Sequence, residues 1–596
     1  MWITFTLLSL LIFLLSVAAA TLRGIQRKRY RLSPLYILLI GVFIADFLAL
    51  FPPYYLTVLE GNGILKSLFM VFHDTLQLFT INNDFSLILE HAHGISEMER
   101  NLYTVYVAFL YAFTPILTVG VGLSFFRNLS AYCKYFFHYN SDVYVFSDWN
   151  DKTATLAKSI VEKDSRAVIL LTSRDKESEE DEELNRKARD VGSIDFASHI
   201  CDLHLGFHSK AKRISFFFLK DTSYSASENV EEAIATLKQY ADRENTFLYV
   251  FSNVNAHEAI LNAQKGKALV RRINSMQSLI QMFLYKKGIE IFESAKEDTD
   301  GVKRISIALV GFGSYGAEFL RALPWFVTQK GYQTEIHVFD KKKDAISSFQ
   351  ALYPDLNYAN SPRFIEDAFY SIHFHEMSAD SLEFAKLIEQ TPFTFAFVIT
   401  GDNDRNLRIS LQLRTMFERK KEKPLIYTRI SSPVLSNCST ELFAMDGQKY
   451  DVRLIGSIED TYSYESIIES EWQTLAKQSN YRWLNLLNNT PEMIEKYRKQ
   501  SDERFWQYEL VYSSSIAEAI HSAIRKQLDP YAREIPIDVE PDWQHDEDAR
   551  LEHARWVTFS YAQGYIYAPE KNNRLALTNK FLPANDEERR AILRRM

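Results

Sequence analysis

The sequence begins with a long apolar run, and this run constrains the fold more than any other feature. Residues 2–22 carry almost no charge and are long enough to cross about 30 Å of hydrocarbon as a helix. A signal peptide is the alternative, because the alanines at 18–20 resemble a cleavage site, but its positive charge would precede the apolar run. Here the basic residues follow it, at 23–31. The positive-inside rule therefore predicts that this loop is cytoplasmic and that the N-terminus lies outside.

Two further apolar runs, at about residues 35–56 and 102–126, predict a transmembrane region of three helices within residues 1–127. Three spans that start outside leave the rest of the chain in the cytoplasm. We therefore expect a multi-pass protein of the inner (cytoplasmic) membrane, with the lipid bilayer as a partner. The three cysteines form no CxxC pair, which agrees with a reducing compartment.

The second apolar run contains an acid, Asp46. An intramembrane carboxylate is costly, so Asp46 either lines a pathway, as a pore candidate, or pairs with a neighbouring helix in the interior. Pro52 and Pro53 follow it and are expected to end or kink this helix.

Two other segments of the membrane region leave alternatives open. Residues 118–122 read TVGVG, similar to the potassium-channel filter sequence TVGYG. A filter needs a following inner membrane helix, and the sequence shows none after this motif, so we expect these glycines to permit close packing or a bend. Residues 65–79 have apolar residues at helical spacing and predict an interfacial or re-entrant helix on the outer side, or a small extracellular cap.

After Arg127, short β-rich runs alternate with helical stretches, and the order appears twice. The first copy has strand-like runs at 143–146, 167–172, 214–219 and 246–252, and the second has them from 305, at 335–340, from 395, at 424–430 and from 452. A repeat of this length predicts two tandem α/β doubly wound, Rossmann-like domains at 140–300 and 301–475.

The second copy carries the glycine pattern of a dinucleotide-binding turn in LVGFGSYGAEFL, residues 309–320. The first glycine allows a tight turn, the second lets backbone approach a pyrophosphate and the third lets helix pack on strand. The helix N-terminus offers free N–H groups, and an acid about 24 residues on commonly holds ribose hydroxyls. This predicts NAD(H) or another adenine nucleotide; the alternative is a turn kept only for packing. The candidate residues are Gly311, Gly313, Ser314, Tyr315, Gly316 and Asp340.

The first copy reads FSDWNDKT at the corresponding place and has no glycine there. We expect Trp149 to fill the phosphate space, so that no dinucleotide binds in this copy.

These tandem units, followed by VITGDNDRNL and IYTRI, resemble RCK/TrkA-N domains, the cytoplasmic nucleotide- or ion-sensing modules of bacterial potassium channels and transporters. The resemblance covers roughly residues 140–475 and implies a gating ring rather than catalysis. It matches Asp402, Asp404 and Asn406 to the acidic-then-Asn turn of the family, and Arg429 to its arginine after the fifth strand. Asp402 and Arg429 thereby join the candidate site. A standard filter is the part of the pattern that residues 1–126 lack.

Residues 476–596 predict helices at 513–528 and 546–567. The sequence LEHARW, followed by QGY, resembles the bacterial RyR-type domain, and the resemblance implies a ligand receptor, proposed for nucleotide-second-messenger immunity. An anionic ligand, such as a cyclic or linear nucleotide second messenger, would bind a line of polar and aromatic residues on this helix. The alternative is a local i,i+3 ion pair with a core tryptophan. The line consists of Glu552, His553, Arg555, Trp556 and Tyr565.

These features together predict a ligand-gated membrane receptor or channel that works as a homo-oligomer, a dimer or a tetramer. The resemblance to RyR-type domains implies a role as an antiviral defence effector. A net charge of −8 without a basic tail disfavours nucleic acid as a partner. The alternatives are an NAD(H)- or ATP-regulated subunit of potassium transport and a membrane-tethered nucleotide-binding enzyme. We expect no enzyme and no metal site, because the sequence offers no recognisable catalytic set.

Overall fold

The computed structural model describes most of the chain. The described residues are 2–25, 34–59, 63–80, 96–138, 140–172, 181–205, 212–222, 224–263, 266–299, 301–356, 369–432, 442–443, 447–484, 498, 501–502, 505–506, 508–530, 547–568 and 570–578. The chain forms two compact units, Met1–Lys134 and Tyr135–Met596.

The first unit is helical. Its helices are α1 (Trp2–Ile25), α2 (Pro34–Leu59), α3 (Ile64–Thr80) and α5 (Glu97–Phe136), the last of which runs on into the second unit. Three of them contain stretches long and apolar enough to cross a membrane, namely Trp2–Thr21, Ile37–Tyr55 and Glu97–Val119. The three predicted membrane helices are thus confirmed as candidates, although α5 is longer at both ends than the apolar run 102–126.

Polar side chains join the three candidate membrane helices. The Ser9 hydroxyl of α1 donates to the carbonyl oxygen of Ala45 at 2.6 Å, and the Tyr103 hydroxyl of α5 donates to that of Ala49 at 2.9 Å. Asp46 is fully buried, and one of its carboxylate oxygens accepts a hydrogen bond from the Thr114 hydroxyl at 2.9 Å. This bond is the contact with a neighbouring helix that the second of its two predicted roles requires, and the pore role stays a prediction.

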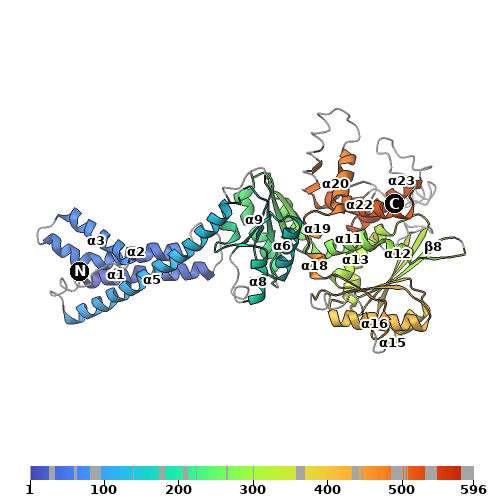
Figure 1. Cartoon of the computed structure of the whole chain (residues 1–596), viewed down its shortest axis with the longest axis horizontal. Coiled ribbons are helices and arrows are strands. Elements are labelled where there is room, and N and C mark those ends of the chain that lie inside the picture. Colours follow the sequence, from blue (N-terminus) through green and yellow to red (C-terminus); the bar gives the residue numbers. More distant parts are fainter. Residues whose placement is uncertain are drawn as a thin grey trace. The chain divides into compact units, whose positions relative to one another are not determined.

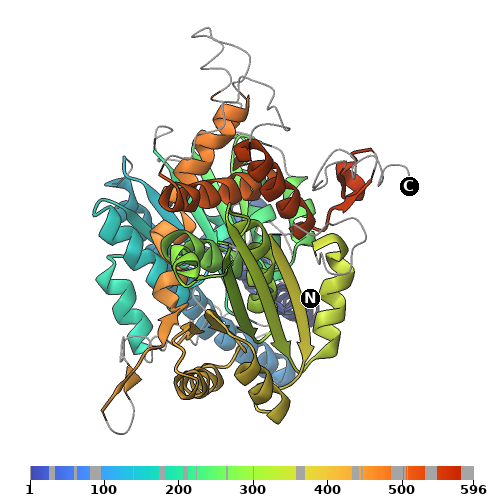
Figure 2. The same ribbon diagram turned by 90° about the vertical axis from the view of Figure 1, so that its right-hand side faces the viewer.

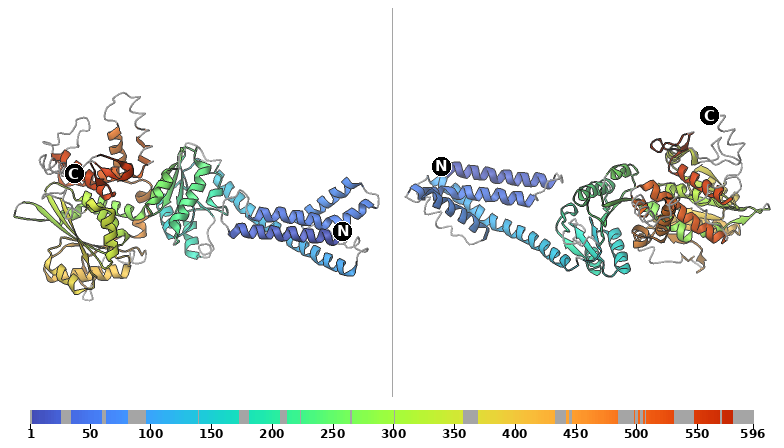
Figure 3. Two further views of the ribbon diagram at one scale, coloured as in Figure 1. Left: turned by 180° about the vertical axis from the view of Figure 1, so that it is seen from behind. Right: turned by 90° about the horizontal axis from the view of Figure 1, so that it is seen from above.

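The prolines of α2 do not end it. The helix continues through Pro52 and Pro53 to Leu59, so of the two predicted effects the ending is wrong, and the kink stays a prediction. Proline is tolerated inside membrane helices because neighbouring groups satisfy the freed backbone carbonyls. Figure 3 shows α1 and α2 side by side in dark blue. The predicted helix at 65–79 is confirmed as α3, which packs on α2.

The first α/β sheet lies in the second unit and has six parallel strands in the order β3-β2-β1-β4-β5-β6. Its strands are β1 (Val143–Phe146), β2 (Val168–Thr172), β3 (Ile194–Phe196), β4 (Ile214–Phe218), β5 (Thr246–Phe251) and β6 (Leu269–Ile273). Its helices are α6 (Asp151–Lys163), α8 (Glu182–Asp190), α9 (Ser225–Tyr240) and α10 (Ala256–Asn262), with a short 3₁₀ helix η2 (Ile200–Asp202).

The second sheet repeats this order as β10-β9-β8-β11-β12-β15, with β7 added antiparallel to β8. Its strands are β7 (Lys296–Glu297), β8 (Lys303–Val310), β9 (Tyr332–Asp340), β10 (Tyr370–Glu376), β11 (Phe395–Val398), β12 (Leu425–Arg429) and β15 (Arg453–Ile455). Its helices are α13 (Ser314–Phe326), α14 (Lys343–Leu352), η3 (Pro354–Leu356), α15 (Leu382–Gln390) and α16 (Asn403–Arg419). A small hairpin, β13 (Leu442–Phe443) and β14 (Lys449–Tyr450), precedes β15. Both sheets have the strand order of the dinucleotide-binding fold, which confirms two doubly wound Rossmann-like domains.

The two sheets exchange their last helices. Helices α11 (Ser275–Lys287) and α12 (Ile289–Glu293) follow the first sheet, but they pack on the second, where the Phe283 ring lies 5.4 Å from Phe397. Helices α18 (Ile458–Thr461) and α19 (Tyr464–Ile467) follow the second sheet and pack on the first, where the Tyr462 ring lies 6.0 Å from Phe251. The core beside each sheet is therefore completed by helices that follow the other sheet along the chain.

The second sheet lies within a stack of helical layers. Helices α15 and α16 cover one face, and α11 and α13 cover the other (Figure 1). Above α11 and α13 lie α20 (Glu471–Leu484), α22 (Glu509–Leu528) and α23 (Glu547–Ala562), the orange and red helices of Figure 2. Residues Trp472, Ile516 and Phe559 of these helices are buried in the same apolar core as Phe319 of α13. The chain's last described elements are β16 (Ile566–Tyr567), η5 (Asn573–Leu575) and β17 (Leu577–Thr578).

Candidate functional site

The three glycines of the turn in the second domain differ in the space that a side chain would have. Gly311 follows β8 with a φ of +100°, and a Cβ there would lie 2.6 Å from the carbonyl oxygen of Ile399. A Cβ on Gly316 would lie 2.2 Å from the carbonyl oxygen of Gly311. A Cβ on Gly313 would meet nothing within 4 Å. The turn thus leaves open space at Gly313, the position predicted to let backbone approach a phosphate.

Helix α13 begins at this turn with an uncapped end. Gly313 is its N-cap, and among the described residues no side chain accepts from its first N–H groups. Unpaired N–H groups at a helix N-terminus are suited to bind a phosphate or another anion. Ser314 is the first residue of the helix and lines the space in front of it.

The corresponding helix of the first domain, α6, caps itself. The Asn150 side chain accepts from the backbone N–H groups of Lys152 and Thr153, both at 3.1 Å. Trp149 is 1% exposed, and its indole N–H donates to the carbonyl oxygen of Leu184 at 2.9 Å. The group that occupies the helix end is therefore Asn150, whereas Trp149 packs in the core.

A cavity of about 610 Å³ lies in front of the glycine turn, at the carboxyl ends of β8, β9 and β11. In a sheet of this order the strand order reverses between the parallel strands β8 and β11. Ligands of doubly wound folds bind in the crevice at this point. Of the predicted residues, Gly311, Gly313, Ser314 and Asp340 line it. Its other polar lining residues include Glu318, Arg321, Lys341, Lys342, Tyr353, Ser378, Thr400 and Arg405.

Asp340 ends β9 and is held by the backbone. One carboxylate oxygen accepts from the Phe312 N–H at 2.6 Å, and the other accepts from the Lys342 N–H at 2.8 Å. A carboxylate has about four acceptor positions. Two acceptor positions therefore remain on the Asp340 carboxylate beside the two backbone bonds.

Five of the predicted residues support the site without lining it. The Arg429 guanidinium lies 3.8 Å above the centre of the Tyr315 ring, and Gly316 is enclosed by the turn. Asp402 caps α16 by accepting from the Arg405 N–H at 2.7 Å. Asn406 is buried, accepts from the Thr400 N–H at 2.6 Å and donates to the Arg429 carbonyl oxygen at 2.9 Å. The acidic-then-Asn turn therefore fixes the end of β11 beside the cavity.

The cations of the cavity were missed by sequence reasoning. Lys341 and Lys342 directly follow Asp340, which is a readable signal. Arg405 reaches the cavity from α16; its Nη2 donates to the Asp380 carboxylate at 3.2 Å, and its Nε has no hydrogen-bond partner among the described residues. Burial lowers the pKa of Arg321, but the neighbouring Glu318 carboxylate outweighs this and leaves the pKa raised. The cavity can thus present several positive charges to a phosphate-bearing ligand.

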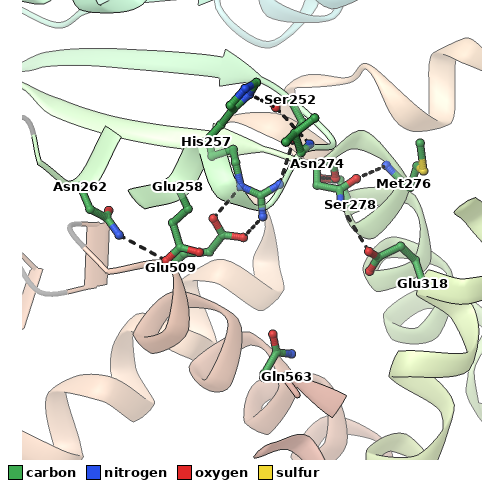
Figure 4. A network of polar contacts seen from close by, with 12 residues as sticks. Ser252, His257, Glu258, Asn262, Asn274, Met276, Ser278, Glu318, Glu509 and Gln563 are labelled. Carbon is green, nitrogen blue, oxygen red and sulfur yellow. Dashed lines mark hydrogen bonds and ion pairs between the residues drawn. The ribbon is translucent and has the colours of Figure 1, made fainter. Parts of the chain in front are cut away.

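One wall of the cavity connects three parts of the unit, and Figure 4 shows one of its contacts, between Asn274 and Glu318. Arg321 donates to the Glu318 carboxylate at 2.8 Å and to the carbonyl oxygen of Ala562, the last residue of α23, at 2.9 Å. It also donates to the Gln563 side chain at 3.0 Å. Glu318 accepts at 3.5 Å from Asn274, the residue after β6 of the first sheet. A ligand beside Glu318 and Arg321 would therefore touch residues that hold the first domain and the C-terminal helices.

The predicted ligand line of α23 is divided between the interior and the surface. Arg555 is 1% exposed, and its Nε donates to both carboxylate oxygens of Glu552 at 2.9 Å. Burial raises the pKa of Glu552, but Arg555 outweighs this and leaves the pKa lowered. Trp556 and Tyr565 are partly exposed, and His553 is half-buried. The i,i+3 ion pair, predicted as the alternative, is thus what the geometry of Glu552 and Arg555 forms.

A buried histidine adjoins this pair. His521 of α22 is fully buried, and its Nε2 lies 2.6 Å from the carbonyl oxygen of Thr328. Burial lowers its pKa from 6.5 to about 4, with Arg555 and Arg525 lowering it further and Glu552 opposing them.

This histidine predicts a loss of stability in acid. Between its folded and unfolded pKa values the unfolded chain binds more protons, so the free energy of unfolding falls as the pH falls. We expect His521 to contribute a loss of about 2 kcal/mol between about pH 7 and about pH 5. Urea unfolding of the wild type and of His521→Gln at both pH values measures it. Equal pH dependence in the two proteins would contradict the assignment.

Among the described residues, no group of three or more His, Cys, Asp or Glu side chains is arranged to hold a metal ion. The sequence matches no protein-family model and no curated protein. The resemblances to RCK/TrkA-N and RyR-type domains therefore stay predictions.

Proposed function

We propose that the chain is a membrane-anchored nucleotide sensor, a ligand-gated receptor or channel that binds NAD(H) or another adenine nucleotide in its second Rossmann-like domain. One observation carries this proposal. The open glycine turn, the uncapped end of α13 and the fixed carboxylate of Asp340 all face one cavity of about 610 Å³. That volume is within the range of cofactor sites. In this proposal the region of the three candidate membrane helices is the part that changes state when the nucleotide binds.

The wall of the cavity supports sensing. A ligand shifts a protein between two states only by its different affinity for them. A phosphate beside Arg321 competes with the Glu318 carboxylate and with the carbonyl oxygen of Ala562 for the same guanidinium. Ligand binding would thereby change how α23 and the first domain are held, and this change is the differential contact that a sensor needs.

The binding step is tested by two substitutions at one position. The protein used is the full chain, reconstituted in lipid nanodiscs. The substitution Gly313→Asp places a carboxylate where the phosphate of the nucleotide would lie. We expect it to weaken binding of radiolabelled NAD or ATP by at least about 100-fold, since it repels the ligand in a confined site. Gly313→Ala is the matched control, because it adds only a methyl group to open space. Binding that survives Gly313→Asp would overturn the site.

The gating step is tested separately. The full chain in liposomes loaded with a potassium-sensitive dye should change its ion flux when the bound nucleotide is added, and Gly313→Asp should remove that change. Binding without any change of flux would favour a receptor that signals by another route.

A further inference from the structure

A second group of cations lies away from the glycine turn, where the first domain meets the C-terminal helices. Its members are Arg213, Arg271 and Lys477, and around them lie the rings of Phe247, Tyr249, Trp506 and Tyr512. We propose that this cluster binds a phosphate-bearing anion that bridges the first domain to α20 and α22. None of its residues lines the cavity beside the glycine turn, so the proposal does not depend on the function proposed above.

Arg271 stands at the centre of the cluster, on the edge strand β6. Its guanidinium lies 3.9 Å from the centre of the Tyr512 ring and 5.4 Å from that of Trp506. It donates to the Tyr512 hydroxyl, a neutral acceptor. Its Nε is buried without a hydrogen-bond partner among the described residues. A buried donor without an acceptor is costly, and an anion at this place would remove the cost.

The other two cations approach the same rings. The Lys477 ammonium lies 5.0 Å from the centre of the Trp506 ring, and that ring lies 6.0 Å from Phe247. The same Phe247 ring also contacts Arg213, whose guanidinium lies 4.1 Å from the ring centre. Arg213 donates to neutral oxygens too, the hydroxyl of Ser215 at 2.9 Å and that of Tyr249.

These three cations form no ion pair with the carboxylates that the structure describes. Glu509, the nearby acid of α22, is already bonded to Arg272 at 2.8 Å. Asp142 accepts from the backbone N–H of Arg213 at 3.1 Å. Burial lowers the pKa of Lys477, and Arg213 and Arg271 lower it further, whereas Asp502 and Glu469 oppose them.

Half-buried cations without counter-ions are unfavourable unless something compensates their charge. A phosphate group matches this arrangement because a guanidinium and an ammonium can bind its oxygens together. Because Trp506 is partly exposed, the phosphate group can belong either to an inorganic anion or to a nucleotide. Because Arg271 belongs to the first domain and Lys477 to α20, the bound anion would hold the two together.

The test uses the full chain in nanodiscs, carrying Gly313→Asp so that the glycine-turn site is blocked. Radiolabelled pyrophosphate is measured by equilibrium dialysis, in parallel with ATP. We expect pyrophosphate to bind this protein and the affinity to fall at least about tenfold when Lys477→Gln or Arg271→Gln is added. Lys303→Gln is the matched control, because Lys303 also faces an aromatic ring, that of Tyr332 at 5.3 Å, but outside the cluster.

Foldedness is checked by the thermal midpoint. We expect pyrophosphate to raise the midpoint of the Gly313→Asp protein and of its Lys303→Gln derivative, and to leave that of Lys477→Gln unchanged. If unlabelled ATP displaces the radiolabelled pyrophosphate at a concentration similar to that of unlabelled pyrophosphate, the bound phosphate group can come from a nucleotide. If unlabelled pyrophosphate displaces it at a lower concentration than ATP does, the site takes the inorganic anion. No pyrophosphate binding, or binding unaffected by Lys477→Gln and Arg271→Gln, would overturn the proposal.

Discussion

Gly316→Ala is expected to lower the free energy of unfolding of the second unit by about 3 kcal/mol, the cost of overpacking a site that cannot relax. The added Cβ would lie 2.2 Å from the carbonyl oxygen of Gly311. Gly311 cannot retreat, because its own Cα faces the backbone of Ile399, where a Cβ would come within 2.6 Å of the carbonyl oxygen. Urea unfolding followed by tryptophan fluorescence measures the loss.

Gly313→Ala is the control within the same turn. Its Cβ would meet nothing within 4 Å, so the free energy of unfolding should change by no more than about 0.5 kcal/mol. The two substitutions thus separate the glycine that the fold needs from the glycine that leaves space for a ligand. Similar losses in both proteins would show that the turn is not built as described.

Most strands of both sheets could be predicted, because continuous apolar runs such as 143–146 and 246–252 mark strands buried on both faces. Strands β3, β6, β7 and β10 were not predicted. Strand β3 has only three residues, and β10 lies at the sheet edge with His373 and His375 on its more exposed face. At an edge the apolar pattern weakens, so the sequence alone does not separate such a strand from a loop.

The exchange of helices between the sheets could not be predicted. The sequence of α11 shows an apolar surface, but the identity of the sheet beneath it depends on packing partners such as Phe397 and Tyr427, more than 100 residues away. Periodicity identifies the buried side of a helix and leaves its partner open.

The candidate site divides in the same way. Gly311, Gly316 and Asp340 are local to one turn and the next strand, so spacing could place them. Arg321 and Arg405 come from two different helices and meet at the cavity only in the fold. The sequence left two roles open for Arg555, a ligand contact and an ion pair with Glu552, because a helix pattern does not show what packs on top of it. Helices α13 and α22 pack on α23, and Arg555 is 1% exposed.

Glu552→Ala is expected to lower the free energy of unfolding by about 4 kcal/mol, because it leaves the Arg555 charge buried and unpaired. Arg555 is 1% exposed, and both of its bonds from Nε end on Glu552 at 2.9 Å. Arg555→Ala should cost a similar amount, since it removes a packed side chain and leaves the Glu552 carboxylate without its partner. Urea unfolding of the two variants measures both losses.

The double variant Glu552→Leu with Arg555→Met decides what the pair does. Replacing a buried ion pair by apolar residues of similar volume is often neutral, so the double variant should recover most of the about 4 kcal/mol lost in Glu552→Ala. If the pair is purely structural, this double variant keeps every ligand response of the wild type. If it also receives a ligand, as the resemblance to RyR-type domains implies, the double variant folds but loses that response. Since Arg555 is 1% exposed, such a ligand would have to displace Glu552, and binding would then come with a measurable opening of α23.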